Sequence, residues 1–89
     1  MKSLSDLWDS ILARLSGELS DMTIKTWFDE ITVVTMEDSA LVLHCSNPFK
    51  KNTVEARFLP HIKAALKDIF STDLEVKILS DEQLAAYHG

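Results

Sequence analysis

The apolar residues near the start of the chain repeat with the period of an α-helix. Six of them recur at i, i+3, i+4, i+7, i+8 and i+11, which predicts a helix with one broad apolar side. Ser3 is a suitable N-cap with Asp6 three residues later, and Gly17 is expected to end the helix in a left-handed conformation. A second, shorter helix is expected after the cap residue Ser20. The apolar positions of the two helices are Leu4, Leu7, Trp8, Ile11, Leu12 and Leu15, then Ile24, Trp27, Phe28 and Ile31.

Three later segments have the composition or the alternation of β-strands. Residues 31–36 are rich in β-branched side chains, which favours a strand. Residues 40–45 are expected to return beside it, with Leu41, Leu43 and Cys45 on one face, after a turn at residues 37–39. In residues 74–78 apolar and charged side chains alternate, which predicts a third strand with one face in solvent.

A long helix is predicted between the second and third strands. Asn47 is a good cap and Pro48 suits the first helical position, so the helix should begin there and run to about residue 70. Pro60 disfavours helical geometry at the residue before it, which predicts a kink or a break near residues 58–60. The inward positions are expected to be Phe58, Leu59, Ile62, Leu66 and Ile69.

The order of these elements predicts one α+β domain over residues 1–79. The order is helix, helix, strand, strand, broken helix and strand, so a three-stranded sheet should be packed on helices. Residues 80–89 are expected to be a frayed turn or the start of a linker. The 89 residues are enough for one domain with a thin core.

Composition narrows the class of protein. No segment is apolar over the roughly 18 residues that a membrane span needs, and the N-terminus lacks a signal-peptide pattern. The single cysteine, Cys45, excludes an intrachain disulfide and favours the reducing cytosol. The net charge is −5, yet residues 48–68 carry five bases against two acids. This basic segment is interpreted either as a local contact patch or as a solvated helix face.

The sequence carries no recognisable catalytic or metal-binding motif. His44, His61, His88 and Cys45 do not fall at metal-ligand spacings. Phosphate-binding glycine loops and an activated nucleophile are also absent from the sequence. We therefore predict a domain without enzymatic activity, in which His44 lies on the sheet surface and Cys45 is an inert buried thiol.

A series of short motifs resembles the N-terminal domain of DnaA, the bacterial chromosomal replication initiator. The resemblance covers residues 4–79 and implies a KH-like fold. It also implies that ATP, magnesium and duplex DNA are bound by other parts of the full-length protein, beyond a flexible linker, so that this domain needs no cofactor. The motifs are Leu7-Trp8, Ala13-Arg14-Leu15, Leu19-Ser20, Thr26-Trp27-Phe28, Ser46-Asn47-Pro48-Phe49 and Arg57-Phe58-Leu59.

The resemblance also implies partners: other copies of the initiator, the replicative helicase, regulatory proteins and, weakly, single-stranded DNA, with no membrane contact. Leu7 and Trp8 match a pair implicated in self-association through the first helix, and Ile11 lies on the same side. The broad apolar face of that helix leaves residues at its edge for a partner helix. The alternative is that Trp8 is a core residue.

Phe49 matches a phenylalanine placed at the helicase contact, with Asn47 two residues before it. The second helix of the family often offers an acid to the same partner, and here that position is Thr23, with Asp21 nearby. In the first turn of a helix, Phe49 is expected to project outward as an anchor. The alternative is that its ring folds over the helix start.

Lys50, Lys51 and Arg57 are candidates for contacts with the phosphates of single-stranded DNA. The glycine loop of true KH domains is absent, and Thr53 stands where the family commonly has an aromatic residue, so weak, salt-sensitive binding is expected at best. Two alternative functions remain open: a small KH-like module that binds single-stranded nucleic acid, and a stand-alone adaptor or inhibitor.

Overall fold

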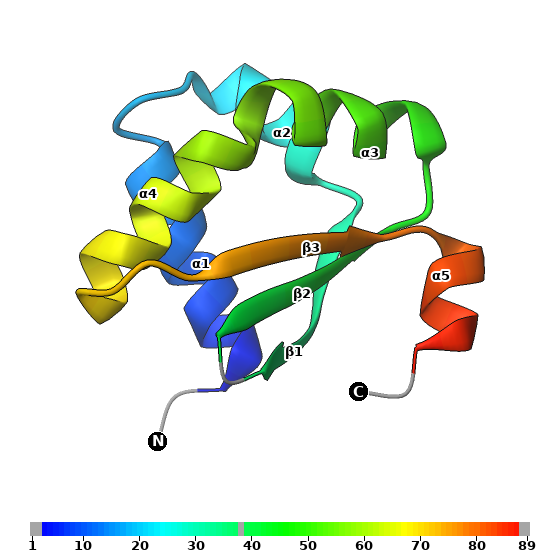
Figure 1. The fold of residues 1–89 in the computed structure, drawn as a ribbon. Helices are drawn as coiled ribbons and strands as arrows, with labels where there is room; N and C mark the ends of the chain where they lie inside the picture. Colours follow the sequence, from blue (N-terminus) through cyan, green and yellow to red (C-terminus); the bar gives the residue numbers. More distant parts are fainter. Residues whose placement is uncertain (1–2, 38, 88–89) are drawn as a thin grey trace.

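The computed structural model describes residues 3–37 and 39–87. Helices and a three-stranded sheet form an α+β arrangement, with the predicted order of elements through residue 79 (Figure 1). The predicted turn between the first two strands includes Asp38, which lies outside the described residues. The elements are α1 (Leu4–Leu15), α2 (Asp21–Phe28), β1 (Ile31–Glu37), β2 (Ala40–Cys45), α3 (Pro48–Thr53), a π-helical turn (Val54–Phe58), α4 (Leu59–Phe70), β3 (Glu75–Leu79) and α5 (Asp81–Ala86).

The sheet is mixed, with β2 between its two neighbours. β1 and β2 pair antiparallel as the predicted hairpin, whereas β3 runs parallel to β2. A parallel pair needs a long crossover, which α3 and α4 supply. The register of the hairpin shifts between Val33 and Thr35, so Val34 is an extra residue that increases the local twist.

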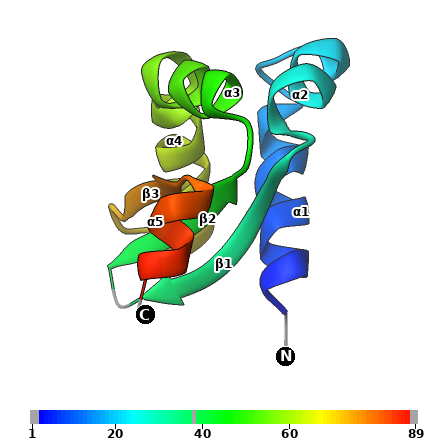
Figure 2. The same cartoon turned by 90° about the vertical axis from the view of Figure 1, so that its right-hand side faces the viewer.

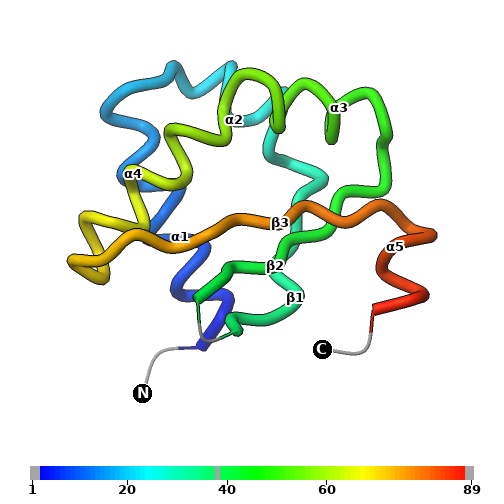
Figure 3. The backbone as a smooth tube through the Cα atoms, in the orientation of Figure 1, coloured from blue at the N-terminus to red at the C-terminus, as the bar shows by residue number. Residues whose placement is uncertain are grey.

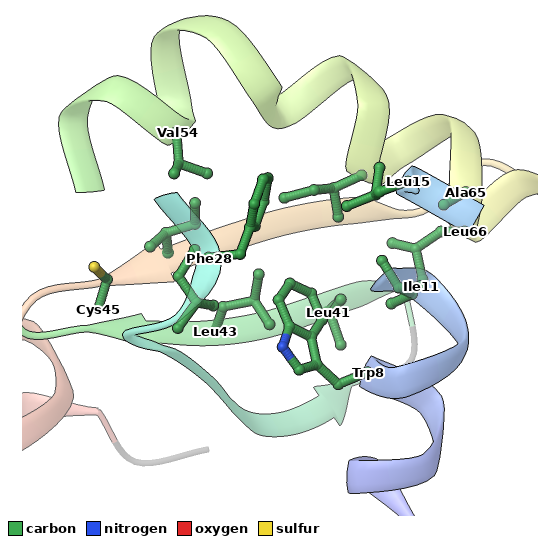
Figure 4. Close-up of a cluster of buried hydrophobic side chains, with 13 residues drawn as sticks. Trp8, Ile11, Leu15, Phe28, Leu41, Leu43, Cys45, Val54, Ala65 and Leu66 are labelled. Atoms are coloured by element: carbon green, nitrogen blue, oxygen red, sulfur yellow. The ribbon is translucent and has the colours of Figure 1, made fainter. Parts of the chain in front are cut away.

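The hydrophobic core lies between the helices and one face of the sheet. α1 contacts β1 and α4, and α4 contacts β3, so these two helices cover that face (Figure 2). Figure 4 shows Trp8 and Phe28 among the aliphatic side chains of this cluster. The fully buried members are Ile11, Leu15, Leu41, Leu43, Cys45, Val54, Ile62 and Leu66. Within residues 3–37 and 39–87, no helix is long and apolar enough to cross a lipid bilayer.

The break predicted near Pro60 is confirmed, and it takes the form of a π-helical turn. α3 continues into that turn, which ends at Phe58, and Pro60 lies in the first turn of α4. Phe58 departs from ideal helical values, at φ −111° and ψ −7°, because the proline ring crowds the preceding turn. Leu59, the residue before Pro60, keeps right-handed helical geometry at φ −56° and ψ −43°, so the prediction that helical geometry is disfavoured at that residue is wrong. A single π-helical turn within an α-helix is the usual form of this rare geometry.

The prediction for Gly17 is wrong. Gly17 does not adopt the left-handed conformation, and α1 ends at Leu15 with Ser16 still in right-handed geometry, at φ −65° and ψ −16°. Backbone hydrogen bonds continue past the helix, since the amide of Leu19 donates to the carbonyl of Leu15 over 2.7 Å. The chain therefore leaves α1 through a tight turn that needs no positive φ.

Residues 81–86 form a short helix where a frayed turn or a linker was predicted. Ser80 caps α5, and Gln83 returns the hydrogen bond as in a capping box. The signal was present in the sequence, because a serine followed three residues later by glutamine is a helix-start pattern. Figure 3 traces the chain as it turns back after β3 into this helix, which contacts β2 and β3.

α5 is held against the sheet by two side-chain contacts. His44 Nε2 lies 2.6 Å from Asp81 Oδ1, and the Tyr87 hydroxyl donates to the Glu37 carboxylate. His44 and Glu37 lie on the face opposite the core, since alternate residues of a strand point to opposite sides. Burial of Val42 on that same face explains why β2 is apolar at nearly every position.

Candidate functional site

Phe49 is the most conspicuous side chain near the start of α3. Asn47 caps the helix, and Oδ1 of Asn47 accepts hydrogen bonds from the amides of Phe49 and Lys50 over 3.0 and 3.2 Å. Because the cap fixes the first turn, the Phe49 ring projects outward, with 68% of the residue exposed. The expectation that Phe49 projects is therefore confirmed, and Asn47 acts as the residue that orients it.

The exposed ring borders a shallow, largely apolar depression of about 470 Å³, which we call the Phe49 hollow. Its other aromatic wall is Trp27, whose ring centroid lies 5.8 Å from that of Phe49. The small side chains of Thr53 and Ala56 leave the space open. The hollow is lined by Trp27, Phe49, Asn52, Thr53, Ala56 and Arg57.

Trp27, Phe28 and Phe58 were expected at inward positions, but they divide between the core and this surface. Phe28 is buried against Trp8, whereas Trp27 and Phe58 are half-buried. Trp27 links the two environments, because its ring centroid lies 6.4 Å from that of Phe58 and 5.8 Å from that of Phe49. Helical spacing predicts an inward position for Trp27, but it could not show that part of the ring remains exposed at the hollow.

Two of the three candidate DNA-binding cations are engaged within the protein. Lys50 Nζ lies 2.9 Å from Asp29 and 3.0 Å from Glu30, and these hydrogen bonds raise the pKa of Lys50 above its ordinary value. Lys51 pairs with Glu55 over 2.8 Å. The structure therefore does not bring these lysines together with Arg57 as a continuous basic patch.

Arg57 differs from both lysines. It is exposed at the rim of the Phe49 hollow, and it forms no ion pair with any residue in the ranges 3–37 and 39–87. Its guanidinium offers five N–H donors in a fixed, planar arrangement. The hollow thus combines two aromatic walls with one cation that the described part of the chain does not neutralise.

Asp21 and Thr23 lie at the start of α2, and neither lines the Phe49 hollow. The Thr23 amide donates to the hydroxyl of the cap residue Ser20 over 3.1 Å, and the two hydroxyls lie 2.8 Å apart. Asp21 is exposed and lines a separate shallow surface beside Met22, an exposed methionine that the sequence analysis did not single out. Thr23 therefore acts mainly as part of a helix cap.

The three candidates for self-association in α1 have different surroundings. Ile11 is fully buried and Trp8 is 8% exposed, so both are core residues, and their assignment as direct contacts with a partner needs correction. The physical reason is that their side of α1 packs on the sheet and on α4. Leu7 is half-buried and reaches the surface.

A second apolar depression, of about 280 Å³, lies where the start of α1 meets the end of α4. We call it the Phe70 hollow, after an aromatic residue that is 43% exposed. Phe70 could not be recognised as a surface candidate from the sequence, because nothing in the chain's local pattern places the end of α4 beside the start of α1. The hollow is lined by Ser3, Leu4, Leu7, Ser10, Ile69 and Phe70.

Groups suited to metal binding or to nucleophilic chemistry are not gathered at either hollow. Among residues 3–37 and 39–87, no cluster of three or more histidine, cysteine, aspartate or glutamate side chains could hold a metal ion. Cys45 is buried as predicted, and its thiol donates to the carbonyl of Asn47 over 3.5 Å.

Comparison with known proteins identifies the family. A family model described as the DnaA N-terminal domain matches residues 5–68. The chain is 29% identical over 80 residues to the chromosomal replication initiator protein DnaA of Gloeobacter violaceus, covering 90% of this chain and 18% of that protein. It is 31% identical over 75 residues to the protein of the same name from Nostoc punctiforme, covering 84% of this chain and 16% of that protein.

The chain thus spans less than a fifth of the length of these relatives. The matched region extends from α1 to α4 and includes most of the residues that form the two hollows. Phe49, Trp27 and Leu7 all lie inside it. The chain belongs to the DnaA N-terminal domain family.

Proposed function

We propose that this domain is a docking module of a chromosomal replication initiator that acts in the cytoplasm and performs no catalytic step itself. The observation that carries the proposal is the exposed Phe49 ring, held by a helix cap beside Trp27. Exposed aromatic residues next to an apolar depression are typical anchors of protein interfaces. The partner proposed for this surface is the replicative helicase, with regulatory proteins as competitors for it.

We assign self-association to the Phe70 hollow. Leu4, Leu7 and Phe70 present apolar surface there, and α1 is the helix in which the family resemblance places contacts between initiators. Because Trp8 and Ile11 are buried, the contact would be made by the edge of α1 and by the end of α4. The two hollows involve different residues, so one domain could engage both kinds of partner at once.

The relatives that share this domain are named chromosomal replication initiator protein DnaA. ATP binding and origin recognition are proposed for parts of such a protein outside this chain. Weak individual contacts would suffice for a tethered domain, because initiators clustered on DNA raise the effective concentration of their docking surfaces.

Binding of single-stranded DNA is the less favoured alternative. Lys50 and Lys51 are engaged by carboxylates, and the net charge is −5, whereas affinity for nucleic acid depends on neutralising several phosphates. With Arg57 as the one free cation that the described residues leave at this surface, the affinity for DNA would depend only weakly on salt concentration.

A pair of matched substitutions tests the proposal. Phe49→Ala should weaken binding of the replicative helicase by roughly 30-fold, as expected for an aromatic anchor worth about 2 kcal/mol, and should leave self-association unchanged. Phe70→Ala should weaken self-association and should leave helicase binding unchanged. Helicase affinity is measured by calorimetry and self-association by sedimentation equilibrium.

Each variant serves as the control for the other, since both remove one exposed phenylalanine ring. If Phe49→Ala binds helicase as well as the unmodified domain does, the helicase docks elsewhere. If Phe70→Ala associates normally, the Phe70 hollow is not the self-association surface.

A further inference from the structure

The lysines near the Phe49 hollow are paired with carboxylates, whereas Arg57 is not paired within the described part of the chain. On the side of Lys50, two carboxylates share one ammonium group, and Lys51 is balanced by Glu55. Arg57 is the rim residue whose charge is not balanced by the described part of the chain. A partner that approaches this hollow therefore meets one exposed guanidinium beside an apolar depression.

The size of the hollow limits what can fill it. Between Phe49 and Arg57 the helix contributes Asn52, Thr53 and Ala56 to the lining of the hollow. The Thr53 hydroxyl is turned toward the helix, because it donates to the carbonyl of Phe49 over 3.0 Å. The hollow is accordingly largely apolar, and its volume of about 470 Å³ is ample for an aliphatic side chain of a partner.

We propose that the Phe49 hollow takes a peptide segment in which an aliphatic side chain is accompanied by an aspartate or a glutamate, whose carboxylate pairs with Arg57. This inference rests on the proposed docking function and adds the chemistry of the partner. A carboxylate accepts two parallel hydrogen bonds from a guanidinium, which gives orientation as well as affinity. The aliphatic side chain supplies apolar burial between Trp27 and Phe49.

A nucleic-acid ligand fits the same surface less well. Stacked bases would need a run of phosphates to follow a basic groove, and here Asp29, Glu30 and Glu55 lie beside the lysines that would otherwise form it. A protein carboxylate needs only the one cation that Arg57 offers. The observations thus favour an acidic, apolar peptide over DNA.

The test measures the affinity of purified replicative helicase for variants of this domain. Arg57→Glu should weaken binding by tenfold or more, because a charge-assisted hydrogen bond is worth roughly 1.5–3 kcal/mol and each 1.4 kcal/mol is about a factor of ten. Arg57→Lys should retain part of the affinity. Lys67→Glu makes the same change in net charge on an exposed part of α4 and should have little effect.

The apolar half of the proposal is tested by filling the hollow. Ala56→Leu should weaken helicase binding by a similar factor, since the added side chain occupies the space proposed for the partner. Ala64→Leu places the same side chain at an exposed position on α4, outside the hollow, and should not affect binding. Circular dichroism of each variant verifies that the domain remains folded.

The partner's carboxylate is identified by charge reversal. Among surface Asp→Lys and Glu→Lys variants of the helicase, one should bind poorly to the unmodified domain and recover affinity for Arg57→Glu. Unchanged affinity of Arg57→Glu, together with a clear loss for Phe49→Ala, would overturn the acidic-peptide inference and leave the docking function intact. Unchanged affinity of Phe49→Ala would instead overturn the docking function.

The DNA alternative is tested with a 20-nucleotide oligothymidine at physiological salt. No measurable binding is expected. Binding that depends on both Arg57 and Phe49, and that displaces the helicase, would replace the peptide proposal with a nucleic-acid one.

Discussion

Oδ1 of Asn47 accepts a hydrogen bond from the backbone amide of Phe49 over 3.0 Å. The residue that starts α3 thus also fixes the direction of the proposed anchor. Replacing an asparagine cap by alanine typically costs about 1 kcal/mol. Asn47→Ala should lower the free energy of unfolding by roughly that amount and should weaken helicase binding, because the first turn of α3 frays.

Asn47→Asp supplies the control for this prediction. Aspartate is an equally good cap and its charge suits the helix N-terminus, so stability and binding should both be retained. Urea denaturation and calorimetric titration provide the two measurements. A loss of binding in Asn47→Asp with unchanged stability would mean that the asparagine amide contacts the partner directly.

Trp8 and Leu7 are neighbours in the chain but should respond differently to truncation. Trp8 is packed against Phe28, with ring centroids 6.3 Å apart, so Trp8→Ala should destabilise the domain by about 3–5 kcal/mol. Leu7→Ala removes a half-buried side chain at the Phe70 hollow and should reduce self-association with a smaller loss of stability. Urea denaturation and sedimentation equilibrium separate the two effects.

A suitable comparison is Trp8→Phe, which keeps an aromatic ring in the core. It should preserve both folding and self-association, since the indole is not proposed to contact a partner. If a folded Trp8→Phe variant failed to associate while its stability was normal, Trp8 would have to reach the partner after all.

The contact between Tyr87 and Glu37 should make the docking of α5 dependent on pH. The hydrogen bond from Tyr87 lowers the pKa of Glu37 below its ordinary value of 4.5, with a further contribution from Lys77. Because the pKa is lowered in the folded state, this stabilisation is present above pH 4.5 and is lost as the pH falls through the folded-state pKa. Tyr87→Phe should therefore reduce the melting temperature at pH 7, and this effect should diminish as the pH falls below 4.5.

The same bond raises the pKa of Tyr87 above its ordinary value of 10.0. Its contribution should accordingly also be lost at strongly alkaline pH, as the pH rises through the folded-state pKa of the phenol. Glu37→Gln should reproduce the reduced pH dependence of Tyr87→Phe. A destabilisation by Tyr87→Phe that stayed constant from pH 7 through the acidic range would show that the hydroxyl acts independently of the carboxylate.

Ser71 offers a site for stabilising the domain. It ends α4 with φ at 58° and ψ at 26°, and it is the one non-glycine residue with positive φ in the described ranges. The left-handed conformation costs an L-residue about 1–2 kcal/mol, whereas glycine pays about 0.5–1 kcal/mol in backbone entropy. Ser71→Gly should therefore increase the free energy of unfolding by roughly 0.5 kcal/mol, and Ser71→Val should decrease it.

The local pattern of the chain predicted the elements that depend on nearby residues. The α1 stripe, the cap at Asn47, the break before Pro60 and the alternation of β3 are all set by interactions within a few positions. α5 was missed although its Ser80–Gln83 capping pattern is local, because the segment is short and only weakly apolar. Gly17 was assigned a conformation that glycine permits but that the turn after α1 does not require.

The sequence by itself determined which residues are apolar, where α1, α2 and α3 begin, and, through its resemblance to a family, that Phe49 is a candidate anchor. Only the tertiary structure decided which apolar residues remain exposed. Trp27 borders the Phe49 hollow and Phe70 joins Leu7 because α2 meets α3 and α1 meets α4 in space. Likewise, only the tertiary structure showed that carboxylates lie within ion-pairing distance of Lys50 and Lys51. Exposure and charge pairing depend on neighbours distant along the chain, and periodicity carries no information about those neighbours.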